Sequence, residues 1–592
     1  MNAGGGALRA LLLDGRGGAR LALYYAPIGA PHPLGDMLFA PSFGEEMNRC
    51  RAMVSMQARA LAAIGIGTLV LDPYGTGDSA GEHSEATWEQ WREDLRAGIA
   101  WLREHGNGCR TLWGVRVGAL MASELAALDG GIEQLVFWQP VVDGKQFFTQ
   151  FLRIRIAAEL EQNGGIKSTE ELRKMAASGQ VIEVSGYQVN GQLAREMDAL
   201  KLSDASGVRA KRVFWCEVLP AADSNVPRAN TKMVEAWQAG GVAVTFEKVV
   251  GPSFWQVHER EVAPDLITAT THYLKNQRTT AVASDAAKPA SHAASLTETP
   301  ITSATREYPV LFACAGDELT GMIHRGRPDA KRGVVIVVAG GPQYRAGAHR
   351  QFVSLARKLA SRCGYPVLRF DLRGMGDSAG VHRGFQQSAA DIRAAIDTLL
   401  KHEPSLESVV LLGECESASG ILFYAYRDER AQGVVLVNPW VRTEGGRAEV
   451  IMKHYYWSRL TSKDFWRKVA GGQFNPIESL VGFFTTVRNY LSGRKLRRVT
   501  ADDSADVANL PLPVKTAVGL RRFRGRVLIL MSGNDYIARE FDEVIRSSQA
   551  WVGLLDDPRV LRRDLEGADH TFSREQWKRQ ASDWVCEWVA SW

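Results

Sequence analysis

The sequence predicts an α/β fold built twice, as two tandem domains that each have a mostly parallel sheet, flanking helices and a helical cap insertion. Short β-branched runs alternate with helical patterns, which is typical of parallel strands joined by crossing helices. The same frame also occurs twice, since Asp371 follows Asp72 at an offset of 299 residues and roughly a hundred residues align without a gap. A chain of 592 residues is long enough for two full cores.

The repeated frame is clearest in one ten-residue motif. Residues 72–81 (Asp-Pro-Tyr-Gly-Thr-Gly-Asp-Ser-Ala-Gly) and 371–380 (Asp-Leu-Arg-Gly-Met-Gly-Asp-Ser-Ala-Gly) agree at seven of ten positions. Between the copies, residues 277–306 are rich in Ala, Ser, Thr and Pro and contain no aromatic residue, as expected of a flexible linker. We therefore place the domains at 1–276 and 307–592.

The strands and helices of the two copies follow one order. In the second domain we expect strands at 334–338, 366–370, 409–412, 433–437 and 527–531, with helices near 352–361, 389–401 and 417–426. In the first domain we expect strands at 37–39, 67–71, 111–113, 134–137 and 213–215. Helical insertions at about 142–209 and about 441–522 would form caps over the carboxyl ends of the strands, where open α/β sheets bind ligands.

Composition excludes several classes of function. The 71 Lys and Arg against 66 Asp and Glu give a net charge of +5 without a long basic run, which argues against a nucleic-acid partner. Seven scattered Cys without a CxxC pair favour a reducing compartment, so we expect a cytoplasmic protein. The chain begins without a signal-peptide pattern and contains no run of 18 apolar residues, so we expect no transmembrane segment.

A glycine-rich loop offers one alternative function. Gly75-x-Gly77-x-x-x-Gly81 is similar to a dinucleotide-binding loop, and the second domain repeats it. The third Gly stands at the wrong distance, and no acidic residue ends a second strand at the expected spacing of ~20 residues. We therefore expect no cofactor and no metal.

A sharp turn between a strand and a helix contains the candidate nucleophile. Residues 413–417 (Gly-Glu-Cys-Glu-Ser) place small residues two positions either side of Cys415, as a strained turn requires. At a helix N-terminus, the dipole and free N–H groups should favour the thiolate. Ser417 and Ser419 are rival nucleophiles, but neither has Gly two residues before it.

This turn resembles the nucleophile elbow of the α/β-hydrolase superfamily, Gly-x-nucleophile-x-Gly. The resemblance implies that an acid and a histidine base follow the nucleophile in chain order, and Asp535 and His570 meet that order. His570 would take the proton of Cys415, and Asp535 would orient the imidazole. The superfamily's other acid position is Asn438 here, and Asp569 is an alternative partner for the histidine.

Two backbone N–H groups are expected to form the oxyanion hole. By its position in the elbow, Glu416 supplies the first. The second should come from the loop 339–343, in which Pro342 has no N–H to donate. Gly341 or Gln343 is then the second donor, and the sequence does not choose between them.

The first domain cannot use the same chemistry. Arg116 stands where Cys415 stands, and a guanidinium cannot attack a carbonyl. Alignment of the corresponding turns places Phe254 at the position of His570. Because a cation at the start of a helix faces an unfavourable dipole, we expect an internal carboxylate, with Glu217 as the candidate, to neutralise Arg116. A bound anion or an acidic group of the other domain is the alternative.

Further motifs resemble one pair of families. Residues 340–352 (Gly-Gly-Pro-Gln-Tyr-Arg-x-Gly-x-His-Arg-Gln-Phe) and 369–378 (Arg-Phe-Asp-x-Arg-Gly-Met-Gly-Asp-Ser), with the Cys elbow, are similar to the exosortase A system-associated hydrolase 1 family. Residues 40–48 (Ala-Pro-Ser-Phe-Gly-Glu-Glu-Met-Asn), with the Arg elbow, resemble the companion hydrolase 2 family. The resemblance implies cytoplasmic hydrolases linked to bacterial exopolysaccharide and protein-sorting systems, here fused so that the two halves pack together and work as a pair.

The expected function is a Cys-dependent hydrolase or acyltransferase of the esterase or thioesterase type in the second domain. It would act through an acyl-enzyme on a small-molecule or carrier-protein-bound acyl substrate. The first domain would be a pseudoenzyme that stabilises or regulates the second. The alternative is a catalytically silent binding or scaffold pair of hydrolase-fold domains.

Overall fold

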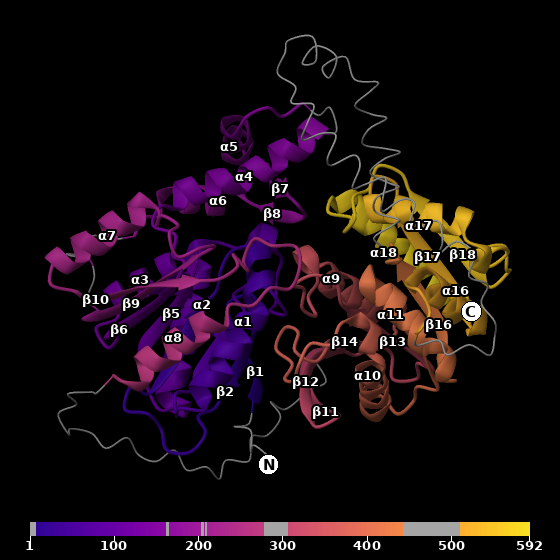
Figure 1. The fold of residues 1–592 in the computed structure, drawn as a ribbon, viewed down its shortest axis with the longest axis horizontal. Coiled ribbons are helices and arrows are strands. Elements are labelled where there is room, and N and C mark those ends of the chain that lie inside the picture. The colour runs from indigo at the N-terminus through magenta and orange to yellow at the C-terminus, as the bar shows by residue number, and fades with distance from the viewer. Residues whose placement is uncertain (1–7, 162–164, 203–206, 208–209, 278–305, 442–508) are drawn as a thin grey trace.

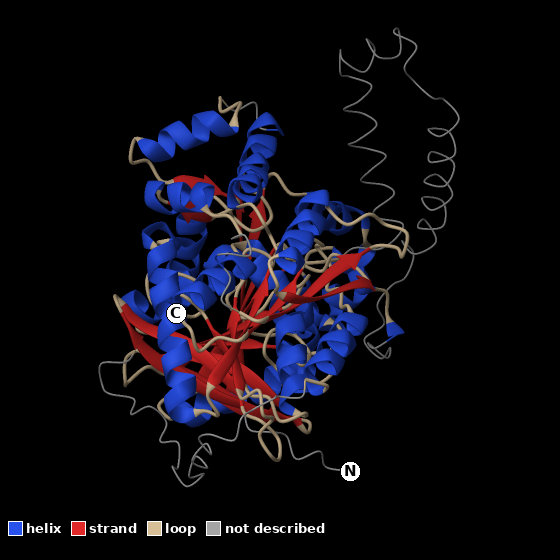
Figure 2. Ribbon diagram, turned by 90° about the vertical axis from the view of Figure 1, so that its left-hand side faces the viewer, coloured by secondary structure: helices blue, strands red, loops and turns tan. Residues whose placement is uncertain are grey.

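The computed structural model describes residues 8–161, 165–202, 207, 210–277, 306–441 and 509–592. Each half of the chain contains one eight-stranded sheet, which confirms the predicted pair of tandem α/β domains. Figure 1 shows each half with its own sheet and helices, and Figure 2 shows helices packed alongside the strands.

The first sheet has the strand order β1-β2-β4-β3-β5-β6-β9-β10. Its strands are β1 (Leu8–Gly15), β2 (Gly18–Tyr25), β3 (Asp36–Ala40), β4 (Thr68–Leu71), β5 (Cys109–Val115), β6 (Gln134–Trp138), β9 (Arg212–Leu219) and β10 (Ala243–Val250). β2 runs antiparallel to β1 and β4, and the remaining neighbours are parallel. The short hairpin of β7 (Ile182–Val184) and β8 (Tyr187–Val189) stands apart from this sheet.

The second sheet repeats this topology as β11-β12-β14-β13-β15-β16-β17-β18. Its strands are β11 (Glu307–Cys314), β12 (Asp317–His324), β13 (Arg332–Val338), β14 (Val367–Asp371), β15 (Ser408–Glu414), β16 (Ala431–Val437), β17 (Arg526–Ser532) and β18 (Val560–Leu565). β12 is again antiparallel to both of its neighbours, and the other pairs are parallel.

Helices follow the parallel strands in both halves. In the first half they are α1 (Glu45–Ala62), α2 (Trp88–His105), α3 (Gly118–Leu128), α4 (Gly144–Glu161), α5 (Thr169–Ala177), α6 (Gly191–Ala199), α7 (Arg228–Ala239) and α8 (Pro264–Lys275). Among the described residues of the second half they are α9 (Gln351–Lys358), α10 (Ala389–His402), α11 (Glu416–Tyr424), α16 (Leu512–Arg522), α17 (Tyr536–Ser547) and α18 (Glu575–Ala590).

Each sheet has a hydrophobic core on both faces. In β3, Leu38 belongs to one buried cluster, and its neighbours Met37 and Phe39 belong to another. In β13, Val335 and Ile336 divide in the same way between two clusters of the second half. Successive side chains of a strand point to opposite faces, so burial on both faces explains the near-continuous apolar runs of these strands.

The strands that the sequence predicts all form, but the structure adds the outer strands. The β1–β2 and β11–β12 hairpins and the edge strands β10 and β18 were not expected. β18 reads Val-Leu-Arg-Arg-Asp-Leu and has no fully buried residue, so its pattern lacks the apolar run that identifies an inner strand.

The two predicted insertions are described to different extents. The described part of 142–209 contains α4, α5, α6 and the β7–β8 hairpin. Of 441–522, only Val441 and residues 509–522 are described, and the latter include α16. The interior of the predicted linker, 278–305, lies outside the described residues.

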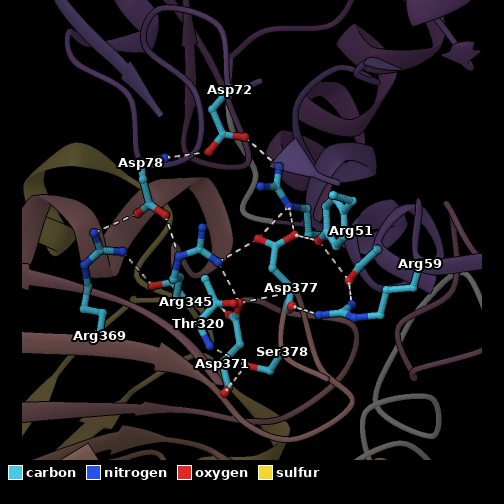
Figure 3. A network of polar contacts seen from close by, with 12 residues as sticks. Arg51, Arg59, Asp72, Asp78, Thr320, Arg345, Arg369, Asp371, Asp377 and Ser378 are labelled. Carbon is cyan, nitrogen blue, oxygen red and sulfur yellow. Dashed lines mark hydrogen bonds and ion pairs between the residues drawn. The ribbon is translucent and has the colours of Figure 1, made fainter. Parts of the chain in front are cut away.

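The repeated ten-residue motifs of the two halves face each other across a buried ionic network. Figure 3 shows Arg345 contacting Asp78 of the first half as well as Asp371 and Asp377 of its own half, at distances of 2.6 to 2.7 Å. Arg51 of the first half contacts Asp377 at 2.7 Å and Asp72 at 2.6 Å. These side chains are at most 2% exposed. The two glycine-rich ten-residue motifs, 72–81 and 371–380, therefore lie in a contact between the halves.

Candidate active site

Cys415 lies at a sharp turn between β15 and α11. Its backbone angles, φ 58° and ψ −119°, are strained for a residue with a side chain. The turn is fixed because the Cys415 N–H donates to the Val437 oxygen at 2.8 Å and the Trp440 N–H donates to the Cys415 oxygen at 3.1 Å. A side chain at Gly413 would lie 2.7 Å from Ser417 Oγ. The turn therefore has the geometry that the elbow motif predicts.

His570 and Asp535 lie beside this turn. Asp535 follows β17 and caps α17, and its Oδ2 lies 2.7 Å from His570 Nδ1. The Cys415 thiol lies near the same imidazole, since His570 lowers the pKa of the thiol and Cys415 raises the pKa of the ring. The His570 side chain is 30% exposed and Cys415 is partly exposed, so neither residue is fully enclosed in the core. The three residues expected from the chain order thus come together.

Asn438 holds the histidine loop in place. Its Nδ2 donates at 2.8 Å to the backbone oxygen of His570 and at 2.8 Å to Ser532 Oγ. The Ser532 hydroxyl in turn donates to the Asp569 oxygen at 2.8 Å. At the superfamily's other acid position, this chain therefore has an amide that positions the backbone of the base.

The side chains considered as alternatives have other partners. The Ser417 hydroxyl donates to the Glu414 oxygen at 2.7 Å, and the Ser419 hydroxyl donates to the Trp440 oxygen at 2.5 Å. The Asp569 carboxylate accepts the N–H of Ser573 at 2.8 Å. These contacts favour Cys415 as nucleophile and Asp535 as the partner of the imidazole.

The ionisation of the Cys415 thiol differs from the expectation that the helix N-terminus favours the thiolate. Burial raises the pKa of Cys415, His570 opposes the rise, and Glu416 and Glu414 add to it. The expected stabilisation of the thiolate by the helix N-terminus is therefore outweighed by desolvation. Burial would lower the pKa of His570, but Asp535 and Cys415 raise it well above its usual value. Thiolate and imidazolium are thus each favoured by the other.

Glu414 is a residue of this site that the sequence reasoning missed. It is buried beside Cys415, and its Oε2 accepts a hydrogen bond from Gln351 Nε2 at 2.6 Å. Burial raises its pKa to about 7, with His570 lowering it and Asp535 adding to the rise. It also lines a small cavity of about 40 Å³ together with Gln351 and Lys578. In the sequence, the signal for Glu414 was its charge, because it occupies the variable position between Gly413 and Cys415 of the elbow.

The oxyanion-donor candidates lie around the sulfur. Glu416 is the first residue of α11, so its N–H is at the helix end beside Cys415. In the opposite loop, a Cβ built on Gly340 would lie 3.8 Å from Cys415 Sγ. Gly341 and Gln343 follow within the same loop, so both remain candidates for the second donor.

The corresponding turn of the first half has the same backbone without the chemistry. Arg116 has φ 55°, and its N–H donates to the Trp138 oxygen at 3.0 Å. Phe254 is buried and packs against Trp138 with a ring distance of 6.3 Å. Thus the structure retains the elbow shape in a half whose corresponding residues are Arg and Phe.

The carboxylate that neutralises Arg116 is not the predicted one. Arg116 Nη2 lies 3.1 Å from Glu46 Oε1 in α1. Glu217 instead accepts hydrogen bonds from Trp215 Nε1 and Asn230 Nδ2, both at 2.7 Å. The carboxylate that pairs with Arg116 was therefore expected in the wrong element: Glu46 forms the ion pair, whereas Oε1 of Glu217 is held by neutral donors inside the core and Arg116 only lowers the pKa of Glu217.

The chain was compared with known proteins. Residues 334–583 match the Alpha/beta hydrolase family model, and no curated protein matches the sequence. This match, together with the fold, identifies the C-terminal half as an α/β-hydrolase domain.

Several solved structures are similar in part. An esterase of Pyrococcus furiosus is 12% identical and covers 48% of this chain and 91% of its own, with a TM-score of 0.32. The esterase domain of a Rhodothermus marinus protein is 15% identical over 48% of this chain and 98% of its own, with a TM-score of 0.30. Est1E of Butyrivibrio proteoclasticus, with ferulic acid bound, is 17% identical over 45% and 96%, with a TM-score of 0.31.

None of the helices in the described ranges combines the length and apolarity needed to cross a bilayer. No cluster of three or more His, Cys, Asp or Glu side chains suited to a metal ion occurs in the same ranges.

Proposed function

We propose that the C-terminal half is a Cys-His-Asp hydrolase or acyltransferase that acts on an ester or thioester through an acyl-enzyme. The observation that carries this proposal is the meeting of Cys415, at a strained elbow, with the His570 imidazole, whose Nδ1 lies 2.7 Å from Asp535 Oδ2. This is the arrangement of nucleophile, base and orienting acid that acyl transfer requires.

In the first half-reaction, Nε2 of His570 takes the thiol proton because Nδ1 faces Asp535. The sulfur then attacks the acyl carbonyl carbon, and the carbonyl oxygen becomes an oxyanion near the N–H of Glu416 and the loop 339–343. Collapse of this intermediate breaks the bond to the leaving alcohol or thiol, which takes the proton from His570. The product of this step is a thioester at Cys415.

In the second half-reaction, water or another acceptor attacks that thioester. His570 removes the acceptor's proton and returns it to the sulfur as the acyl group leaves. A thioester suits a thiolate nucleophile because exchange of the acyl group between sulfurs is nearly balanced, whereas an amide has a poor leaving group. The acyl group can be presented on a small molecule or on a carrier protein.

For the first half, we propose a pseudoenzyme role over residues 1–276, separated by the linker 277–306 from the catalytic domain at 307–592. Arg116 and Phe254 cannot supply a nucleophile or a base. Contacts such as Arg345 with Asp78 support a pairing of the two halves within one chain. The first half would then support or regulate the second.

The wider context is also a proposal. The motifs of the two halves resemble the exosortase A system-associated hydrolases 2 and 1, so we propose a role in a bacterial exopolysaccharide or protein-sorting system. The seven cysteines are all free thiols, which supports a cytoplasmic location.

The test uses the full chain with Cys415→Ala and His570→Ala variants. Wild-type protein should hydrolyse p-nitrophenyl acyl esters, and each variant should lose activity by about 10³-fold or more because the triad acts as a unit. Iodoacetamide should alkylate Cys415 faster in the wild type than in His570→Ala, because His570 lowers the pKa of the thiol. Ester turnover that survives both substitutions would reject the mechanism and favour a silent scaffold pair.

A further inference from the structure

The oxyanion loop of the C-terminal half is bound by the N-terminal half. We call residues 339–350 the donor loop, because they include both candidates for the second oxyanion donor. Gln343 Nε2 donates to Glu45 Oε1 of the first half at 2.8 Å. Asn48 Nδ2, also of the first half, donates to the Gly347 oxygen at 3.0 Å. Both contacts come from the start of α1.

The donor loop has a strained backbone that needs external support. Gly340 and Gly341 have φ of 104° and 59°, and the non-glycine residues His349 and Arg350 have φ of 40° and 61°. Left-handed backbone is unfavourable for a residue with a side chain. Such a conformation persists only when surrounding contacts determine it.

Arg350 supplies one part of that support. Its guanidinium donates to four backbone oxygens of the first half, namely Gly75 at 3.0 Å, Gly77 at 2.9 Å, Ser79 at 2.7 Å and Gly81 at 2.8 Å. These hydrogen bonds hold the C-terminal end of the donor loop on the first half's glycine-rich motif.

The same half also touches the loop near the nucleophile. A Cβ built on Gly341 would lie 2.5 Å from the backbone oxygen of His258. The adjacent Gly340 is the residue whose built Cβ would lie 3.8 Å from Cys415 Sγ. The first half therefore contacts the donor loop at the end closest to the sulfur as well as at its far end.

Glu45 is the residue best placed to transmit this support. Its Oε1 accepts from Gln343, and its Oε2 accepts from the Tyr187 hydroxyl at 2.8 Å and from Asn48 Nδ2 at 3.1 Å. Burial raises the pKa of Glu45, and the rise is opposed by the Tyr187 hydroxyl, the Arg49 guanidinium, the Gln343 amide and the backbone N–H of His349. The Glu45 carboxylate, which belongs to α1, thus joins the cap through Tyr187 to two points of the donor loop, Gln343 and His349.

We propose that Glu45 of the N-terminal half is a positioning residue for acyl transfer at Cys415, because it holds the donor loop in the conformation that presents the second oxyanion N–H. The inference rests on the proposed function of the C-terminal half. It gives the pseudoenzyme half a defined role, which is to complete the oxyanion hole of its neighbour.

The test compares full-length Glu45→Ala and Glu45→Gln with the wild type, using p-nitrophenyl acetate turnover and the iodoacetamide rate of Cys415. Alkylation needs the thiolate but no oxyanion hole, so the two readouts separate positioning from thiol activation. Glu45→Ala should lower kcat at least tenfold, because losing an oxyanion donor costs about 10² to 10³ in kcat. KM and the alkylation rate should stay within about twofold of wild type. Glu45→Gln, which keeps an acceptor oxygen, should lose less.

The control is Glu235→Gln, which removes an exposed carboxylate from α7 of the same half and should leave all three values unchanged. Gln343→Ala removes the opposite partner and should give a loss similar to that of Glu45→Ala, with no further loss in the double variant. This pair tests the inference even if one variant folds poorly.

Unchanged kcat in Glu45→Ala would overturn the inference and leave the proposed function intact. Alkylation that falls as much as kcat would also overturn it, since Glu45 would then support the whole site. Failure of the proposed function appears separately, as wild-type turnover equal to that of Cys415→Ala, and the inference would fall with it.

Discussion

At the scale of single residues, the site is a set of groups whose ionisations depend on each other. Burial penalises both the Cys415 thiolate and the His570 imidazolium, and each offsets the penalty of the other. Asp535 adds a carboxylate at 2.7 Å from Nδ1. The second buried carboxylate, Glu414, works against the thiolate because its negative charge raises the pKa of Cys415.

A substitution of Glu414 tests this interplay. Burial raises the pKa of Glu414 to about 7, so the group becomes charged as pH rises through neutrality and then opposes ionisation of the thiol. Glu414→Gln removes that charge, and the pH profile of Cys415 alkylation should shift towards lower pH. A profile that stays in place or moves to higher pH would show that Glu414 does not influence the sulfur.

The residues of the triad could be predicted because their signals are local and ordered. The elbow is a five-residue pattern, and the acid and base follow it in a fixed chain order. The partner of Arg116 could not be predicted in this way, since Glu46 lies 70 residues upstream and reaches the turn only through the packing of α1. The rise in the pKa of Cys415 likewise depends on burial, which the sequence pattern does not report.

At the scale of elements, the two glycine-rich motifs bring four carboxylates together and leave them neutralised by buried arginines. Asp72 and Asp78 come from the first half, and Asp371 and Asp377 come from the second. Sequence patterns indicated the inner strands that precede these motifs, but gave no sign that one motif would face the other. Such a contact depends on tertiary packing between chain segments about three hundred residues apart.

Removal of one carboxylate should therefore destabilise the protein strongly. Asp377→Ala leaves Arg51 and Arg345 without a shared partner, and breaking a buried ion pair costs about 3 to 5 kcal/mol. Asp129→Ala, which breaks the partly exposed pair with Arg103, is the control and should cost at most about 1 kcal/mol. Equal free energies of unfolding for the two variants in urea would contradict this account.

The same network predicts a direction for acid stability. Burial would raise the pKa of Asp377, but Arg51 and Arg345 hold it below its usual value. A carboxylate with a depressed pKa stabilises the folded state fully above its unfolded pKa, about 3.9, and loses that contribution as pH falls towards the folded value. The stability difference between wild type and Asp377→Ala should therefore shrink below about pH 4, as followed by urea unfolding across pH.

At the scale of the whole molecule, the account treats one chain as a catalytic domain and a supporting sibling. The repeat topology was predictable because each copy repeats the pattern of inner strands, whereas the dependence of one half's donor loop on the other was not.

If the contacts between halves are strong, the covalent linker is not needed to hold them together. A protease site placed within 278–305 should allow cleavage without separation of the halves on gel filtration, and ester turnover should persist. Separation with full activity in the C-terminal fragment would contradict the supporting role.

The most direct measurement is the location of the covalent intermediate. Full-length protein is mixed with an acyl thioester, quenched in acid, digested and examined by mass spectrometry. The account predicts one acyl group, on the peptide that contains residues 413–417, attached at Cys415 and absent from Cys415→Ala. Acylation of Ser417 or Ser419, or turnover without dependence on Cys415, would contradict it.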